Sequence, residues 1–89
     1  MFIFDQQKSE LNLQKHGIDF YDAQKLWEVP SFVLISKYIE EPRCLLIGIV
    51  FQKYWAAVFT ERNSSIRIIS VRRARKNERD LYEKEVKNK

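Results

Sequence analysis

The last third of the chain constrains the fold most, because an apolar strand there runs directly into a basic helix. Segment 66–86 reads IRIISVRRARKNERDLYEKEV. Strict strand alternation puts Ile66, Ile68, Ser70 and Arg72 on one face and Arg67, Ile69, Val71 and Arg73 on the other. Because β-branched residues supply apolar surface to both faces, we expect this strand to lie inside a sheet. From Ala74 onward the apolar residues recur with a helical period, which predicts a C-terminal helix.

The length of the chain allows one small domain, residues 1–89, and no second one. A chain of 89 residues with 45% hydrophobic content can form one core, although a domain of this size buries only about 60–65% of the surface of its unfolded chain. The 16 Lys and Arg residues outnumber the 12 Asp and Glu residues, so the formal net charge is +4. This imbalance favours an anionic partner.

Cysteine and histidine are too few for several kinds of site. Cys44 has no second cysteine with which to form a disulfide, and a single histidine, His16, excludes the usual zinc clusters of four nitrogen and sulfur ligands. The longest apolar run, residues 44–51, is far shorter than the ~20 residues that span a bilayer. The opening MFIFDQQ lacks the basic and apolar regions of a signal peptide. We therefore expect a cytoplasmic protein with no membrane partner, no metal and no other cofactor.

Two short helices are predicted after a short strand at residues 2–4. Asp5 and Asp19 are good N-caps, and Gly17 supplies the left-handed conformation that commonly ends a helix. Pro30 prevents further extension of the second helix. The predicted helices are Gln6–His16 and Phe20–Glu28.

Four strands follow, and short connections make neighbouring strands antiparallel. The predicted strands are Phe32–Ile39, Arg43–Gln52, Tyr54–Arg62 and Ser65–Arg73, with turns at residues 40–42, 52–53 and 63–65. The middle two strands are apolar on both faces, which indicates that helices cover much of the sheet. The predicted fold class is therefore α+β: a small single domain with an antiparallel four-stranded meander, an additional short N-terminal strand, two N-terminal helices and one C-terminal helix. We expect residues 32–39 to form an edge strand.

His16, in the sequence Lys15-His16-Gly17, is a candidate proton carrier. A histidine with an ordinary pKa near ~6.5 gives or takes a proton at neutral pH, and a neighbouring lysine could hold a phosphate meanwhile. Equally, positive side chains in a last helical turn suit the helix dipole. The sequence leaves both interpretations open.

Arginines near the end of the chain are candidate phosphate ligands. Arg62 follows Glu61 at a strand end, close to Arg67 across the turn, so Glu61 could pair with an arginine. An arginine held by a carboxylate matches phosphate oxygens bidentately, although a purely structural ion pair explains the same residues. A solvated charged face likewise explains the strand–helix junction, whose polar residues are Ser70, Arg72, Arg73, Arg75, Lys76, Glu78, Arg79 and Tyr82.

Together, four pieces of the sequence resemble the BrnT family of bacterial toxins. The pieces are Lys15-His16-Gly17-Ile18; Arg43 ahead of Gly48; residues 58–62; and residues 66–72 followed by Ala74, Glu78, Arg79 and Tyr82. They occur in order over nearly the whole chain. One position departs from the family, which usually has a carboxylate directly before the arginine of the second meander strand. This chain has Pro42 there, with Glu40 and Glu41 displaced, which puts the strength of catalysis in doubt.

The resemblance implies a RelE-like fold, ribonuclease activity that inhibits translation, and neutralisation by a cognate BrnA-like antitoxin. RNA is then the substrate, and operator DNA is contacted only indirectly through the antitoxin. The matching positions expected to be catalytic are Lys15, His16, Arg62, Arg67, Arg72 and Tyr82, and those expected to bind substrate are Arg43, Glu61, Ser70, Glu78 and Arg79.

We hypothesise a metal-independent endoribonuclease, because attack of a 2′-hydroxyl on its neighbouring phosphate needs only cations and a proton carrier. Arg62, Arg67 and Arg72 would hold the scissile phosphate, and His16, aided by Lys15 or Tyr82, would move protons. The remaining arginines and lysine of the junction, Arg73, Arg75 and Lys76, would supply general electrostatic attraction. The alternative is a non-catalytic or degenerate toxin-like binding module that acts through antitoxin binding and operator regulation.

Overall fold

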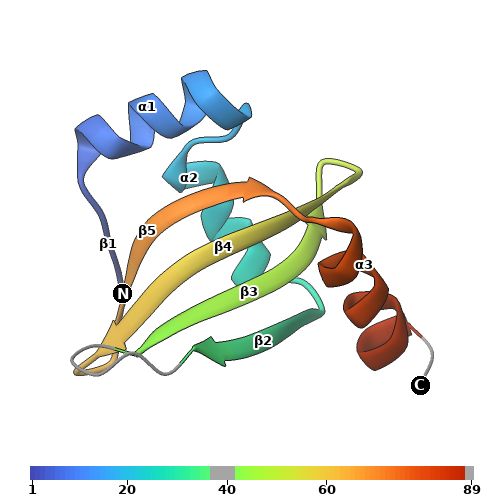
Figure 1. Ribbon diagram of the computed structural model, residues 1–89. Helices are drawn as coiled ribbons and strands as arrows, with labels where there is room; N and C mark the ends of the chain where they lie inside the picture. The colour runs from blue at the N-terminus through green and yellow to red at the C-terminus, as the bar shows by residue number, and fades with distance from the viewer. Residues whose placement is uncertain (37–41, 88–89) are drawn as a thin grey trace.

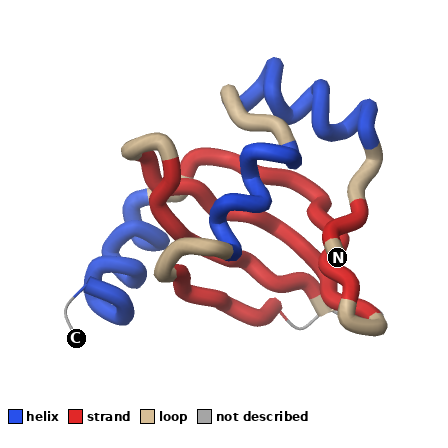
Figure 2. The backbone as a smooth tube through the Cα atoms, turned by 180° about the vertical axis from the view of Figure 1, so that it is seen from behind, coloured by secondary structure: helices blue, strands red, loops and turns tan. Residues whose placement is uncertain are grey.

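A central β-sheet carries helices on both faces (Figures 1 and 2). The computed structural model describes residues 1–36 and 42–87. In chain order the elements are β1 (Phe2–Ile3), α1 (Gln6–His16), α2 (Phe20–Ala23), a 3-10 helix η1 (Gln24–Trp27), β2 (Ser31–Ser36), β3 (Arg43–Val50), β4 (Lys53–Arg62), β5 (Ser65–Arg73), α3 (Lys76–Tyr82) and a π-helical turn η2 (Glu83–Lys87). The predicted α+β class is confirmed.

The sheet has five strands in the order β1-β5-β4-β3-β2 and is mixed. The predicted antiparallel meander from β2 to β5 is confirmed. The N-terminal strand, however, adds to the meander in parallel, with Phe2 paired to Ile66 and Ile3 to Arg67. A purely antiparallel description is therefore wrong. Parallel neighbours need a long connection, and here the N-terminal helices and strands β2 to β4 lie between β1 and β5 in the chain.

Two-residue turns join the last three strands. Phe51 and Gln52 have φ angles of 52° and 62°, and Asn63 and Ser64 have φ angles of 52° and 68°. Left-handed conformations at both central residues match the right-handed twist of a hairpin. The predicted turn at residues 52–53 is shifted by one residue, because Lys53 already pairs with Val50.

The first helix has the predicted bounds, whereas the other two are shorter than predicted. Gly17 ends α1 with a φ of 82°. The second helix is α-helical only to Ala23 and continues as a 3-10 helix to Trp27. The C-terminal helix begins at Lys76 and not at Ala74. Arg75 is its N-cap, because the Glu78 carboxylate accepts a hydrogen bond from the backbone N–H of Arg75, at 2.7 Å.

Each face of the sheet has its own apolar core. On one face α2 and η1 bury residues such as Phe20 and Leu26 against β3, β4 and β5. On the other face α3 buries Tyr82 against Ile47 and Ala56. The prediction that helices cover the apolar central strands is confirmed. No helix in the described ranges, 1–36 and 42–87, is long and apolar enough to cross a membrane.

The edge strand β2 lies where the sequence predicts it, at the end of the sheet opposite β1. Its residues Val33 and Ile35 are 44% and 68% exposed. The predicted continuation at residues 37–39 and the displaced acidic residues Glu40 and Glu41 lie outside the described residues.

The first helix is fastened to β5 by one buried side chain, that of Asn12. Its amide nitrogen donates to the carbonyl oxygens of Ile18, at 2.8 Å, and Val71, at 2.9 Å. Its amide oxygen accepts from the backbone N–H of Val71, at 3.1 Å. Beyond the short β1, the amide group therefore satisfies backbone groups at the edge of β5 as a neighbouring strand would. This contact sets the position of α1 along the sheet.

We expect the Asn12→Ala variant to lose about 2–4 kcal/mol of unfolding free energy, because three buried backbone groups lose their partner. Urea denaturation monitored by circular dichroism measures this loss. The matched control is Gln14→Ala, at an exposed position of the same helix, which should change stability by less than about 0.5 kcal/mol. A loss below about 1 kcal/mol for Asn12→Ala would contradict the anchoring role.

Candidate active site

A β-bulge in β5 decides which side chains share a face of the sheet. Ile68 lies opposite Phe59, and Ser70 lies opposite the next residue along β4, Val58. Ile69 is therefore an extra residue without its own partner on β4. Such an insertion reverses the alternation of the side chains beyond it.

Because of this bulge, Arg67, Ser70 and Arg72 all face the side of the sheet that carries α3. Arg72 lies opposite Ala56, which belongs to the core beneath α3, and Val71 faces the other core. Strict alternation grouped Arg67 with Val71, and that assignment is wrong. The β4 residues opposite Arg67, Ser70 and Arg72 are Thr60, Val58 and Ala56, each two residues from the next. Neighbouring polar positions are therefore separated by about 7 Å along the strand.

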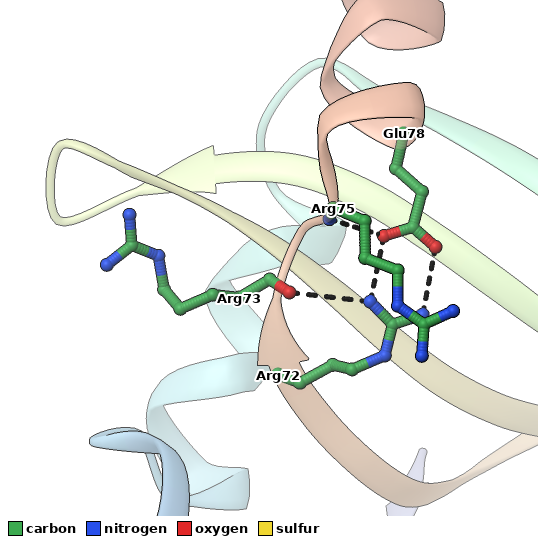
Figure 3. A network of polar contacts seen from close by, with 4 residues as sticks. All are labelled: Arg72, Arg73, Arg75 and Glu78. Atoms are coloured by element: carbon green, nitrogen blue, oxygen red, sulfur yellow. Dashed lines mark hydrogen bonds and ion pairs between the residues drawn. The ribbon is translucent and has the colours of Figure 1, made fainter.

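Arg72 forms a bidentate ion pair with Glu78 in the first turn of α3 (Figure 3). Nη1 donates to Oε1 and Nη2 to Oε2, both at 2.8 Å. The Glu78 side chain is only 7% exposed, whereas that of Arg72 is 25% exposed. The hydrogen bond from Arg72 holds the pKa of the Glu78 carboxyl below its usual range, and the same bond raises the pKa of Arg72.

The ion pair leaves one edge of the Arg72 guanidinium available. Nη1 also donates weakly to the carbonyl oxygen of Arg73, at 3.4 Å. The edge formed by Nε–H and the second Nη2 hydrogen has no partner among residues 1–36 and 42–87. Two parallel N–H groups on such an edge match two oxygens of a phosphate. Glu78 therefore orients Arg72 without occupying all of it.

The C-terminal end of α1 lies beside Ser70. Lys15 and His16 line a hollow of about 200 Å³ together with Ile69 and Ser70. Both helix residues are exposed and follow Asn12 by about one turn. The Asn12 contact with β5 thus brings the predicted proton carrier to the predicted phosphate-binding strand.

Two further hollows extend along β5 toward its turn with β4. The larger, of about 510 Å³, is lined by Arg62 and Arg67 together with Thr60 and the residues around β1. The smaller, of about 100 Å³, brings Arg43 of β3 to Arg67. The structure therefore gathers four of the predicted arginines on or beside the α3-side face of the sheet.

Tyr82 does not join this group. It is 4% exposed, its hydroxyl donates to the carbonyl oxygen of Pro30 at 3.1 Å, and its ring packs edge-on against Tyr54 at 5.7 Å. Burial raises the pKa of the Tyr82 hydroxyl. Its helical spacing from Glu78 places it against the sheet, where it holds α3 in place and does not face the arginines.

Two other predicted residues also lie apart. Glu61 sits opposite Ile66, on the α2 side of the sheet, and makes no ion pair within the described ranges, so its expected pairing with an arginine is not found there. The carboxylate that pairs with an arginine is that of Glu78, which binds Arg72. Arg79 is exposed on α3. Among the described residues, no group of three or more His, Cys, Asp and Glu side chains is arranged to hold a metal ion.

Sequence reasoning missed two residues that shape the site. Asn12 is polar yet 6% exposed, and it lies in a helix with few apolar residues. A buried polar residue of this kind leaves no periodic signal. Lys8 lies on the α1 wall of the site and lines two of its hollows, although a lone lysine near a helix start is unremarkable in sequence.

The sequence profile of the ribonuclease toxin BrnT, of type II toxin-antitoxin systems, matches residues 4–78. The match extends from the end of β1 into the first turn of α3 and includes the Arg72–Glu78 pair. Arg79 and Tyr82, the two expected site residues that the structure sets apart on α3, lie beyond it. A comparison with curated proteins finds no match.

We expect Glu78→Gln to lower the unfolding free energy at pH 7 by about 1–3 kcal/mol, since the arginine loses a charged partner. Because folding lowers the pKa of Glu78, the contribution of its charge is full above the unfolded pKa of about 4.3 and is lost as pH falls through the folded value. The difference between wild type and variant should therefore shrink below about pH 4.3.

Urea unfolding at several pH values between 7 and 3 measures this difference. Glu10→Gln, which removes an exposed carboxylate from α1, is the matched control and should change stability by less than about 0.5 kcal/mol at every pH. An equal cost of Glu78→Gln at pH 3 and pH 7 would show that the carboxylate charge contributes nothing.

Proposed function

The chain belongs to the BrnT family of ribonuclease toxins of type II toxin-antitoxin systems, and we propose that it cleaves RNA on the α3-side face of β5. The observation that carries this proposal is the bulge, which aligns Arg67, Ser70 and Arg72 on one face of the sheet, with Ser70 beside the end of α1. We further propose that the mixed sheet, with α1 along β5 and α3 over one face, is a RelE-like arrangement.

The proposed reaction is attack of a ribose 2′-hydroxyl on the adjacent phosphate. The 2′-oxygen forms a bond to phosphorus, the bond from phosphorus to the 5′-oxygen breaks, and a 2′,3′-cyclic phosphate and a free 5′-hydroxyl result. The 2′-hydroxyl loses a proton and the 5′-oxygen gains one. Charge accumulates on the non-bridging oxygens in the transition state, so correctly placed cations accelerate the step without a metal ion.

The roles follow from where the side chains lie. The available edge of Arg72 binds the non-bridging oxygens of the scissile phosphate. Arg67, whose partner on β4 is two positions from that of Ser70, lies between this phosphate and the next one. His16 carries the proton, and Lys15 adds positive charge in the same hollow. Arg43 and Arg62 bind flanking phosphates of the RNA. Tyr82 has no part in this scheme, because its hydroxyl is buried against Pro30.

We expect the purified protein to cleave RNA in the presence of EDTA. His16→Ala should lower kcat about 10²–10⁴-fold, since proton transfer is lost, and Arg72→Lys should lower it about 10²–10³-fold, since the planar fork is lost while the charge stays. A fluorophore-labelled RNA assay under single-turnover conditions measures both.

The control is Arg73→Lys. Arg73 is the neighbour of Arg72 on the same strand, but it stacks over Trp55 at 5.6 Å on the opposite face, and Figure 3 shows its side chain directed away from the ion pair. Its substitution should leave cleavage nearly unchanged. The proposal fails if fresh wild-type protein cleaves no RNA, or if the His16→Ala, Arg72→Ala double variant cleaves at the wild-type rate.

In the cell, we propose that the protein acts in the cytoplasm, inhibits translation by cleaving RNA, and is neutralised by a cognate BrnA-like antitoxin. Operator DNA would then be contacted through the antitoxin alone. Basic side chains along β5 would attract an acidic antitoxin segment as well as RNA.

Expression of the chain alone should arrest bacterial growth, whereas co-expression with the antitoxin, or expression of the His16→Ala, Arg72→Ala variant, should not. Growth curves after induction, with western blots to equalise protein levels, measure this. The alternative of a degenerate toxin, which the Pro42 departure motivates, predicts normal growth for all of these strains.

A further inference from the structure

We infer that Lys8 of α1, together with Arg43 and Arg67, forms a second phosphate-binding subsite next to the proposed reaction position. This inference rests on the proposed function and specifies its substrate: single-stranded RNA that continues past the cleaved phosphate along α1. Lys8 is not among the positions that the resemblance marks as catalytic or substrate-binding. Its place in the fold is what identifies it.

The subsite is the hollow of about 100 Å³ between α1, β3 and β5. Its lining consists of Asp5, Lys8, Arg43, Arg67, Ile68 and Ile69. Three cations therefore face one carboxylate, and that carboxylate already accepts hydrogen bonds from the backbone N–H groups of Gln7, at 2.8 Å, and Lys8, at 3.1 Å. The remaining charge is positive, so the hollow suits an anion.

The occupant that we assign to this hollow is one phosphate group of the RNA backbone, because three cationic side chains line it. The sugar and base then extend out of the hollow, as they do when a protein holds a strand by its backbone.

The hollow connects the two others along β5. It shares Arg67 with the larger hollow near the β4–β5 turn, and it shares Lys8 and Ile69 with the hollow that holds His16. The three hollows follow one another along β5, and two of them lie beside α1, which runs alongside β5 in Figure 1. A strand whose scissile phosphate lies at Ser70 would place its next phosphates in these hollows.

The spacing on α1 supports separate phosphate contacts. Lys8 and Lys15 lie two turns apart on the same face of the helix, so their Cα atoms are separated by about 10 Å. They are therefore suited to successive phosphates, with Lys15 beside the reaction position and Lys8 beside the second subsite. A dinucleotide substrate would fill only the first.

The test measures binding of a single-stranded oligonucleotide whose 2′-hydroxyls are methylated, so that it binds without being cleaved. Fluorescence anisotropy over a range of salt concentrations gives the slope of log K against log salt. Lys8→Gln should weaken binding and reduce the magnitude of this slope by about 0.7, the value for one phosphate contact on a single strand.

The matched control is Lys53→Gln, which removes the same charge from an exposed position at the β3–β4 turn. Its slope should equal that of the wild type. An unchanged slope for Lys8→Gln, or an equal reduction for Lys53→Gln, would overturn the subsite.

Cleavage assays separate the subsite from the reaction itself. Lys8→Gln should lower kcat/KM for a ten-nucleotide RNA by a larger factor than for a dinucleotide, because only the longer substrate reaches the second subsite. Equal losses for both substrates would overturn the subsite. Absence of cleavage by wild type would refute the proposed reaction, and the anisotropy measurement would still decide whether Lys8 binds a phosphate.

Discussion

The hydrogen bonds between the Asn12 amide and the backbone of Val71 are the contact on which the rest of the site depends. A two-residue β1 covers only the first part of the β5 edge, and the remaining edge groups need partners. A single amide supplies a donor and an acceptor at once and thereby determines where α1 sits. Lys15 and His16 lie one turn further on, so their position beside Ser70 is a consequence of the same contact.

A second polar contact plays the equivalent part at the other end of β5. The Arg72–Glu78 pair joins the strand to the first turn of α3, and Glu78 also caps that helix. One carboxylate thus positions an arginine and starts a helix. Because the pair uses only one edge of the guanidinium, an orienting interaction is compatible with the phosphate-binding role that we propose for Arg72.

Much of the fold could be predicted because it rests on local signals. The caps Asp5 and Gly17 determined the bounds of α1. The central strands are apolar on both faces, which indicated that helices cover both sides of the sheet. Non-local features escaped prediction. The parallel pairing of β1 and the bulge at Ile69 both depend on partners distant in sequence, which alternation and helical period cannot reveal.

The sequence by itself determined the element order, the concentration of arginine near the end of the chain and the membership of the family, since all three reside in residue identity and spacing. Only the tertiary structure decided which of these residues meet. An extra residue in β5 turned Arg67 to the side of Ser70 and Arg72, and a buried amide brought His16 to that side. The physical reason is that side-chain direction depends on strand register, and register is set across the sheet and not along the chain.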